Sequence, residues 1–113
     1  DRFGLWNDTD GWLLDTVSPS TGTTYRLNAS HNNTSGRKIY RNGGVAASAG
    51  TSTAKPGASA DSILFGMENW AKLEDFDGVV GFAYIAPTLF SDAYVAAEYA
   101  NLNSPATFYT VTG

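Results

Sequence analysis

The sequence contains no cysteine among its 113 residues. Disulfides, thiolate nucleophiles and zinc sites built from cysteine are therefore excluded, although this absence leaves the compartment open. Charged residues are scarce as well, at 16% of the chain, and the net charge is −4. Because there is no basic excess to attract phosphates, we expect no nucleic-acid partner.

Long apolar runs are also missing. No run approaches the length that spans a bilayer, and no signal peptide is visible, so we expect no membrane insertion. The first residue is Asp1 rather than Met, which would fit a chain processed or cut from a longer protein.

The remainder is rich in Gly, Ser, Thr, Asn and Ala, with 42% hydrophobic residues. This composition is typical of short strands joined by polar turns. Many short strands with close turns predict an all-β fold, an antiparallel jelly-roll-like β-sandwich, as a single domain over residues 1–113. The strands are expected at residues 3–6, 12–17, 23–30, 38–41, 44–47, 62–66, 79–86 and 106–111.

The segment 23–30 shows the clearest alternation, with Tyr25, Leu27 and Ala29 on one face of a half-buried strand. A polar turn is expected over residues 31–36. Asn42-Gly43 then predicts a type I′ hairpin turn, which needs two positive φ values. The basic residues before this turn are interpreted as a solvated hairpin edge that discourages strand pairing. They are Arg37, Lys38 and Arg41.

One short helix is predicted over residues 91–101. Ser91 is suited to cap it, Asp92 suits the positive end of the helix dipole, and Phe90 with Val95 would form a hydrophobic staple. Apolar residues then follow at helical spacing and would face the sandwich. They are Val95, Tyr99 and Leu102.

Two stretches resemble a known family. The first is LNAS at residues 27–30 with GRKIYRNG at residues 36–43. The second comprises LFG at 64–66, FDG at 76–78, SDAYVAAEYAN at 91–101 and NSPATFY at 103–109. Together they resemble the C-terminal half of concanavalin A-like, or laminin G-like, jelly-roll domains, and the likeness runs from about residue 23 to the end.

The chain departs from that family in two ways. Gly81 and Phe82 stand where the family usually has Asp-Glu, which argues against an inherited polar site there. The chain is also shorter than a full domain of this type. A half-sandwich would leave strand edges and apolar faces open, so we expect a partner: other copies of the chain or the rest of a parent protein.

Catalysis is not expected. Retaining glycosidases need two carboxyl groups about 5 Å apart. The nearest candidate is the run of residues 74–77, where Asp75 and Asp77 could share a strand face, but Leu73 stands where the glucanase pattern has a third acid. His31, the only histidine, has no accompanying nucleophile motif.

No resident cofactor or metal is expected either. Asp8 and Asp10 alternate before Gly11, which raises the alternative of a calcium-binding turn. An EF-hand needs a third oxygen ligand before that glycine and a later glutamate, and both are missing. A plain turn is the simpler interpretation.

Aromatic residues are the remaining candidates for a binding site. An aromatic ring can pack against the apolar face of a sugar while neighbouring Asp or Asn bind its hydroxyls, although such rings can equally fill the core. Trp70, beside Asn69 in an expected loop, is the best candidate for carbohydrate binding. Trp12 and Tyr84 are the others.

These features predict a non-catalytic glycan-binding or adhesion module of an extracellular or virion surface protein. The alternative is a structural or decoration module of a capsid, fibre or filament that binds protein rather than sugar. The family resemblance supports both functions, because a fold alone does not decide between them.

Overall fold

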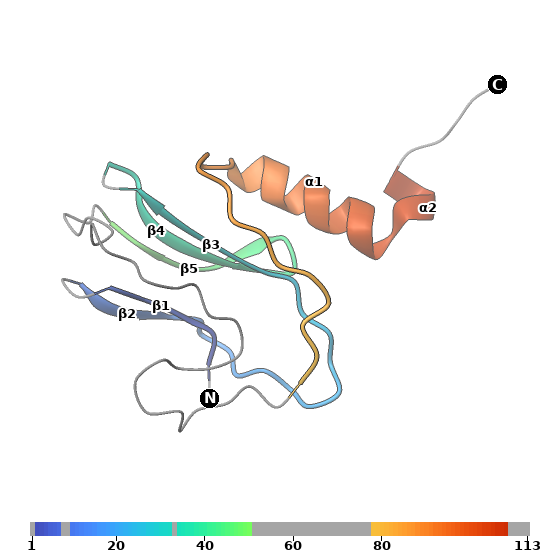
Figure 1. Cartoon of the computed structure of the whole chain (residues 1–113), viewed down its shortest axis with the longest axis horizontal. Helices are drawn as coiled ribbons and strands as arrows, with labels where there is room; N and C mark the ends of the chain where they lie inside the picture. Colours follow the sequence, from blue (N-terminus) through green and yellow to red (C-terminus); the bar gives the residue numbers. More distant parts are fainter. Residues whose placement is uncertain (1, 8–9, 33, 51–77, 109–113) are drawn as a thin grey trace. The chain divides into compact units, whose positions relative to one another are not determined.

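The computed structural model describes residues 2–7, 10–32, 34–50 and 78–108. Within these residues the chain forms five strands and two helices (Figure 1). The strands are β1 (Gly4–Asn7), β2 (Gly11–Leu14), β3 (Leu27–Asn32), β4 (Gly36–Arg41) and β5 (Gly44–Ala49). The helices are α1 (Asp92–Asn103) and α2 (Pro105–Phe108).

The strands form two antiparallel sheets, a β1-β2 hairpin and a three-stranded sheet in the order β3-β4-β5. The prediction of an antiparallel β-rich chain with a short helix near the C-terminus is therefore confirmed. The chain divides into two compact units, one comprising residues 1–54 with 88–113 and the other residues 55–87. The single domain over residues 1–113 stays a prediction, and so does the jelly-roll arrangement.

The turn between β4 and β5 follows directly from its sequence. Asn42 has φ 52° and Gly43 has φ 81°, as a type I′ turn requires, so that prediction is confirmed. Asn42 also ties the turn to the segment before β3. Its side-chain oxygen accepts a hydrogen bond from the Arg26 N–H, and its own N–H donates to the Arg26 carbonyl, both at 2.9 Å.

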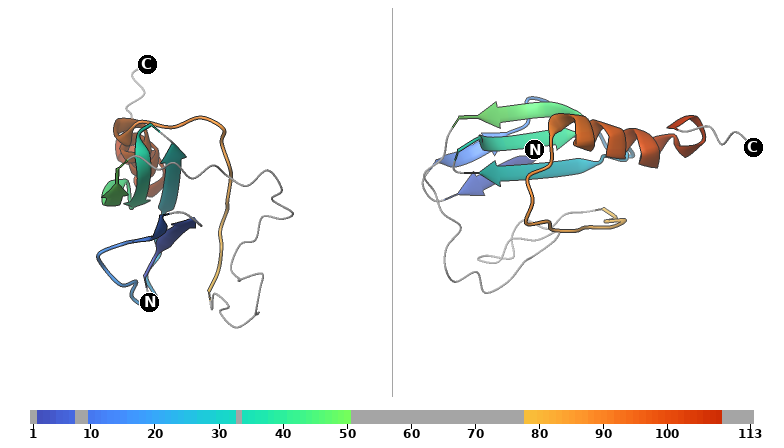
Figure 2. Two further views of the ribbon diagram at one scale, coloured as in Figure 1. Left: turned by 90° about the vertical axis from the view of Figure 1, so that its left-hand side faces the viewer. Right: turned by 90° about the horizontal axis from the view of Figure 1, so that it is seen from above.

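In the first unit, the sheet β3-β4-β5 lies between α1 on one face and the β1-β2 hairpin on the other (Figures 1 and 2). Lys38 and Tyr40 project toward α1, where both bond Asp92. The alternate residues Arg37 and Arg41 project to the other face and bond the segments around the β1-β2 hairpin. Alternation along one strand thus joins a helix on one face of the sheet to a hairpin on the other.

The buried apolar side chains of the described residues are few. They are Ile39, Tyr40 and Val95, each no more than 3% exposed. This small core lies on both faces of β4, with Tyr40 on the side of α1. Side-chain hydrogen bonds to the arginines of β4 supplement this core.

The basic residues of β4 are not a solvated edge, so that prediction was wrong. Arg37 is 4% exposed and its guanidinium donates to the carbonyls of Gly11 at 2.7 Å and Asp10 at 3.3 Å. Arg41 donates to the fully buried carboxylate of Asp15 at 2.8 Å. The sequence could not show this, because it depends on β4 being the central strand.

The β1-β2 hairpin confirms two predicted strands. Its register pairs Trp6 with Trp12, and the Asp15 N–H donates to the Phe3 carbonyl beyond the hairpin. The predicted strand over residues 12–17 is shorter, because β2 ends at Leu14, just before the buried Asp15.

Strand β3 alternates as predicted, but it begins at Leu27 and not at residue 23, and its apolar side is the more exposed one. Leu27 is 42% exposed and Ala29 is exposed, while Asn28 and Ser30 are half-buried. The reason is tertiary: Asn28 and Ser30 pair in register with Tyr40 and Lys38, on the face that α1 covers. The predicted turn over 31–36 also begins later, since β3 continues to Asn32.

Helix α1 begins where the sequence predicts. The Ser91 hydroxyl accepts a hydrogen bond from the Tyr94 N–H at 3.1 Å, so the predicted cap is confirmed. Val95 is buried and Tyr99 is half-buried, whereas Leu102 is 52% exposed. The prediction for Leu102 was wrong, because the described sheet does not cover the last turn of α1. No described helix has the length and apolar character needed to cross a bilayer.

Two predicted strands are absent from the described residues. Residues 79–86 are not assigned to a strand, and neither described sheet includes them. Residues 105–108 form α2 instead of beginning a strand. Pro105 at its first position has a φ preset for a helix, which explains the difference. The predicted strand at 62–66 and residues 109–111 lie outside the described residues.

Candidate functional site

Two hollows adjoin α1, and both belong to the first compact unit. The helix hollow, about 230 Å³, is lined by Tyr94, Ala97, Glu98 and Asn101. The cap hollow, about 260 Å³, is lined by Ser30, Ser35, Gly36, Lys38, Tyr40, Leu89, Phe90, Ser91 and Asp92. Each is smaller than pockets for drug-sized ligands, which start at roughly 300 Å³.

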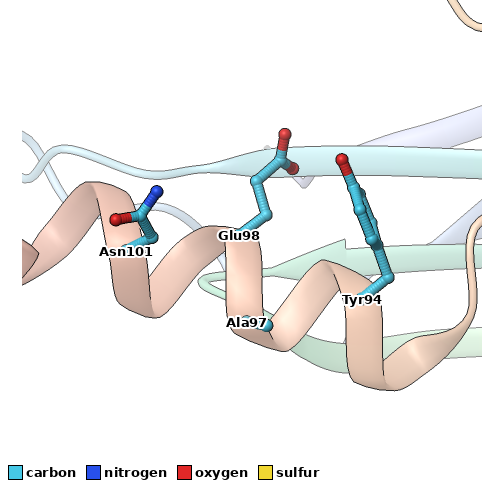
Figure 3. Close-up of a pocket in the computed structure, with 4 residues that line it drawn as sticks. All are labelled: Tyr94, Ala97, Glu98 and Asn101. Carbon is cyan, nitrogen blue, oxygen red and sulfur yellow. The ribbon is translucent and has the colours of Figure 1, made fainter. Parts of the chain in front are cut away.

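The helix hollow follows from helical spacing. Its residues stand at i, i+3, i+4 and i+7, so they share one face of α1. Figure 3 shows Tyr94, Glu98 and Asn101 projecting from the same side of the helix. Tyr94 is 48% exposed, and its ring stacks on Phe90 with centroids 4.4 Å apart and an interplanar angle of 18°. The stack holds an accessible aromatic ring beside a carboxylate and an amide.

Glu98 is held in place by Arg26, the residue that precedes β3. Its carboxylate lies 2.8 Å from the Arg26 guanidinium, and both side chains are largely buried. The Arg26 backbone is bonded in turn to Asn42 in the type I′ turn. The oxygen atoms of Glu98 are therefore held at a defined position instead of moving freely in solvent.

The cap hollow contains a three-residue network around Asp92. The Lys38 ammonium donates to its two carboxylate oxygens at 2.7 and 3.0 Å, and the Tyr40 hydroxyl donates to one of them at 2.9 Å. Asp92 occupies the first turn of α1, where the helix dipole favours a negative charge. The network fixes the beginning of α1 to the centre of β4.

The network shifts the pKa of all three groups. Hydrogen bonds from Lys38 and then Tyr40 lower the pKa of Asp92, and the bond to Asp92 raises the pKa of Lys38. Burial is the main cause that raises the pKa of Tyr40, followed by its bond to Asp92. At neutral pH the site therefore holds a carboxylate, an ammonium and a neutral phenol.

The chemistry available is recognition of neutral polar groups. Each carboxylate is paired with a cation, Asp92 with Lys38 and Glu98 with Arg26. Paired carboxylates keep acceptor oxygens for hydroxyl groups, while their net charge is cancelled. The exposed ring of Tyr94 adds an apolar surface beside these acceptors.

The four residues predicted from sequence are not brought together by the structure. Trp12 is 65% exposed in the first unit, and Tyr84 is 45% exposed in the second. Tyr84 stacks on Phe82, with centroids 6.3 Å apart. Trp70 and Asn69 lie outside the described residues.

The remaining candidates from the sequence are the calcium-binding turn, the acidic run and His31. Asp8 and residues 74–77 lie outside the described residues. The carbonyls of Asp10 and Gly11, which a calcium-binding turn would use, accept hydrogen bonds from the positively charged Arg37. His31 lies on β3 opposite Arg37. Among the residues that the structure describes, no three His, Asp or Glu residues gather as metal ligands.

The residues of the helix hollow were missed by sequence analysis. Their spacing, with Tyr94, Glu98 and Asn101 at i, i+4 and i+7, was visible in the predicted helix. The apolar stripe through Val95 is the stronger signal in the same helical pattern, and it conceals this polar face. The ion pair with Arg26 could not be foreseen, since that residue lies 72 positions earlier in the chain.

Comparison of the chain with models of protein families, with curated proteins and with solved structures gives no match.

Proposed function

We propose that the chain is a non-catalytic glycan-binding module of an extracellular or virion surface protein, built on a concanavalin A-like jelly roll. The observation that carries the proposal is the helix hollow. It offers the half-exposed ring of Tyr94 together with Glu98 and Asn101 on one face of α1.

This combination suits a sugar. A pyranose has an apolar C–H face that packs on an aromatic ring, and equatorial hydroxyls that bond amide and carboxylate oxygens. Ala97 contributes only a methyl group, which leaves room beside the ring. The hollow is open and small, so it suits one sugar ring of a larger glycan more than an enclosed ligand.

The test is a glycan array with the purified chain, followed by titration of the best hit. Tyr94→Ala is expected to weaken binding about tenfold or more, which corresponds to about 1.4 kcal/mol. Trp12→Ala and Trp70→Ala are the comparison variants from the sequence prediction. If Trp70→Ala abolished glycan binding and Tyr94→Ala did not, the proposed function would stand, but the binding site would lie at Trp70. An array without hits would contradict glycan binding.

A second candidate function is a structural module of a capsid, fibre or filament. The specific observation is the run of exposed apolar residues in the second unit, where Val79 is 92% and Ile85 is 66% exposed. Exposed apolar surface of this kind marks protein-interaction sites. An array without hits, combined with strong self-association, favours this function over the first.

A further inference from the structure

The two hollows beside α1 are joined by an aromatic stack. Phe90 lines the cap hollow, and Tyr94 lines the helix hollow (Figure 3). The two rings stack with centroids 4.4 Å apart and an interplanar angle of 18°. Two stacked rings form one continuous apolar surface, so the hollows are the two ends of a single groove.

The ion pairs at the two ends give the length of this groove. Glu98 pairs with Arg26 at the helix hollow, and Asp92 pairs with Lys38 in the cap hollow. The six residues from Asp92 to Glu98 correspond to a rise of about 9 Å along α1. A single pyranose ring is shorter than this span. A sugar that contacts both ends must therefore contain more than one ring.

The cap hollow has the chemistry to bind neighbouring sugar hydroxyls. The Lys38 ammonium and the Asp92 carboxylate lie 2.7 Å apart, and their side chains are 33% and 54% exposed. An ammonium has three donors and a carboxylate has about four acceptor positions, so both keep capacity beyond their mutual bonds. A donor beside an acceptor matches two adjacent hydroxyl groups. Ser30 and Ser35 add hydroxyls to the same hollow.

The charges of the groove favour a neutral ligand. Among the residues that the structure describes, Lys38 is the only cation that lines either hollow, and it is already paired with Asp92. An acidic group on a sugar would have to displace that carboxylate and would be repelled by it. The net charge of −4 on the chain acts in the same direction.

Building on the proposed glycan-binding function, we infer that the two hollows are subsites of one groove that binds a neutral oligosaccharide of two or more rings. One ring packs on Tyr94 in the helix hollow. The saccharide then runs along the Phe90–Tyr94 stack, and Lys38 and Asp92 bind adjacent hydroxyls of a further ring in the cap hollow.

The first test is titration of the purified chain with sugars of increasing length. The probes are linear glucose, mannose and galactose oligomers, each from the monosaccharide upward, with their sulfated and uronate-containing counterparts. The affinity for a neutral series is expected to rise about tenfold or more between the single ring and the oligomers that reach the cap hollow. Affinity that is independent of length, or that is higher for the acidic counterparts, would overturn the inference and leave glycan binding intact. Absence of binding by every sugar would contradict the proposed function itself.

The second test assigns the cap hollow to the far end of the oligosaccharide. Lys38→Met is expected to remove the tenfold gain with length and to leave the affinity for the single ring unchanged, because that ring binds at Tyr94. Equal weakening for the single ring and the oligomer would show that Lys38 only positions α1, which would contradict a subsite. Circular dichroism of the variant checks that the helix is retained.

A milder variant and its control separate binding from folding. Ser35 is exposed and lines the cap hollow, so Ser35→Ala should weaken oligomer binding severalfold without loss of stability. Ser18→Ala is the matched control, since Ser18 is exposed and lines neither hollow. It should bind the oligomer as the wild type does. If Ser35→Ala and Lys38→Met both bound the oligomer as tightly as Ser18→Ala, the cap hollow would not be a subsite.

Discussion

Asp15 is the residue on which the attachment of the β1-β2 hairpin depends most. Its side chain is fully buried, one oxygen accepts from the Arg41 guanidinium at 2.8 Å, and the other accepts from the Val17 N–H at 3.1 Å. A buried charge is tolerated only when such partners replace the lost water. The pair therefore fixes the hairpin to the central strand and leaves little freedom at either residue.

Replacement of one partner should be costly. Asp15→Asn keeps the shape but leaves Arg41 without its counter-charge, and loss of one member of a buried pair costs about 3–5 kcal/mol. Urea denaturation measures the effect. Asp92→Asn serves as the comparison, because that carboxylate is half-exposed in its own ion pair and its loss should cost less. Equal stability of Asp15→Asn and the wild type would contradict this role.

Gly43 is constrained twice, by its backbone and by α1. Its φ of 81° lies in the left-handed region, and a Cβ atom there would stand 2.9 Å from the Tyr99 Cβ. Gly43→Ala should therefore lower the free energy of unfolding by about 1–2 kcal/mol from the backbone alone, with a further loss from the contact. The measurement is again urea denaturation.

Gly44 offers the matched control for this substitution. An added Cβ would meet only the Arg41 carbonyl oxygen at 3.8 Å, an ordinary contact distance. Gly44→Ala should thus change stability by less than about 0.5 kcal/mol. If both variants had the same stability in urea, the result would contradict both the strained backbone of Gly43 and its close contact with α1.

At the scale of elements, the position of α1 depends on the sheet more than on its own apolar face. Only Val95 in this helix is buried, while Asp92 and Glu98 anchor it to Lys38, Tyr40 and Arg26. The docking of α1 on the sheet should therefore depend on pH, because these ion pairs and hydrogen bonds weaken when either side chain loses its charge.

The direction of the pH effect follows from the two pKa shifts. The pKa of Asp92 is lowered in the folded chain, so its contribution is complete above the ordinary value of 3.8 and is lost as the pH falls through the lowered one. The pKa of Lys38 is raised, so its contribution is complete below 10.5 and is lost as the pH rises through the raised value. Docking of α1 should therefore be strongest between these limits.

The check is the urea midpoint measured from neutral pH down to about pH 3, with helix content followed by circular dichroism. Asp92→Asn should be less stable than the wild type at neutral pH, and the difference should shrink in acid. A difference that stayed constant with pH would show that the carboxylate charge does not hold the helix.

For the whole molecule, stability should be unevenly distributed. Strand β4 is bonded on both sides and carries the buried Ile39 and Tyr40, so its amides should exchange with solvent most slowly. Amides in the last turn of α1, residues 100–103, lie outside the small buried core and should exchange faster. Hydrogen exchange read by NMR measures both. Slower exchange in residues 100–103 than in β4 would contradict this order.

The local features could be predicted from the amino-acid sequence, because each depends on residues close together in the chain. The type I′ turn at Asn42-Gly43, the cap at Ser91, the β1-β2 hairpin and the alternation of β3 all follow from short-range sterics and hydrogen bonding. Packing between distant elements decides which face of β3 is covered, that Arg37 of β4 is buried, and that Glu98 meets Arg26. Those outcomes depend on which elements pack together, and the same local pattern is compatible with several packings.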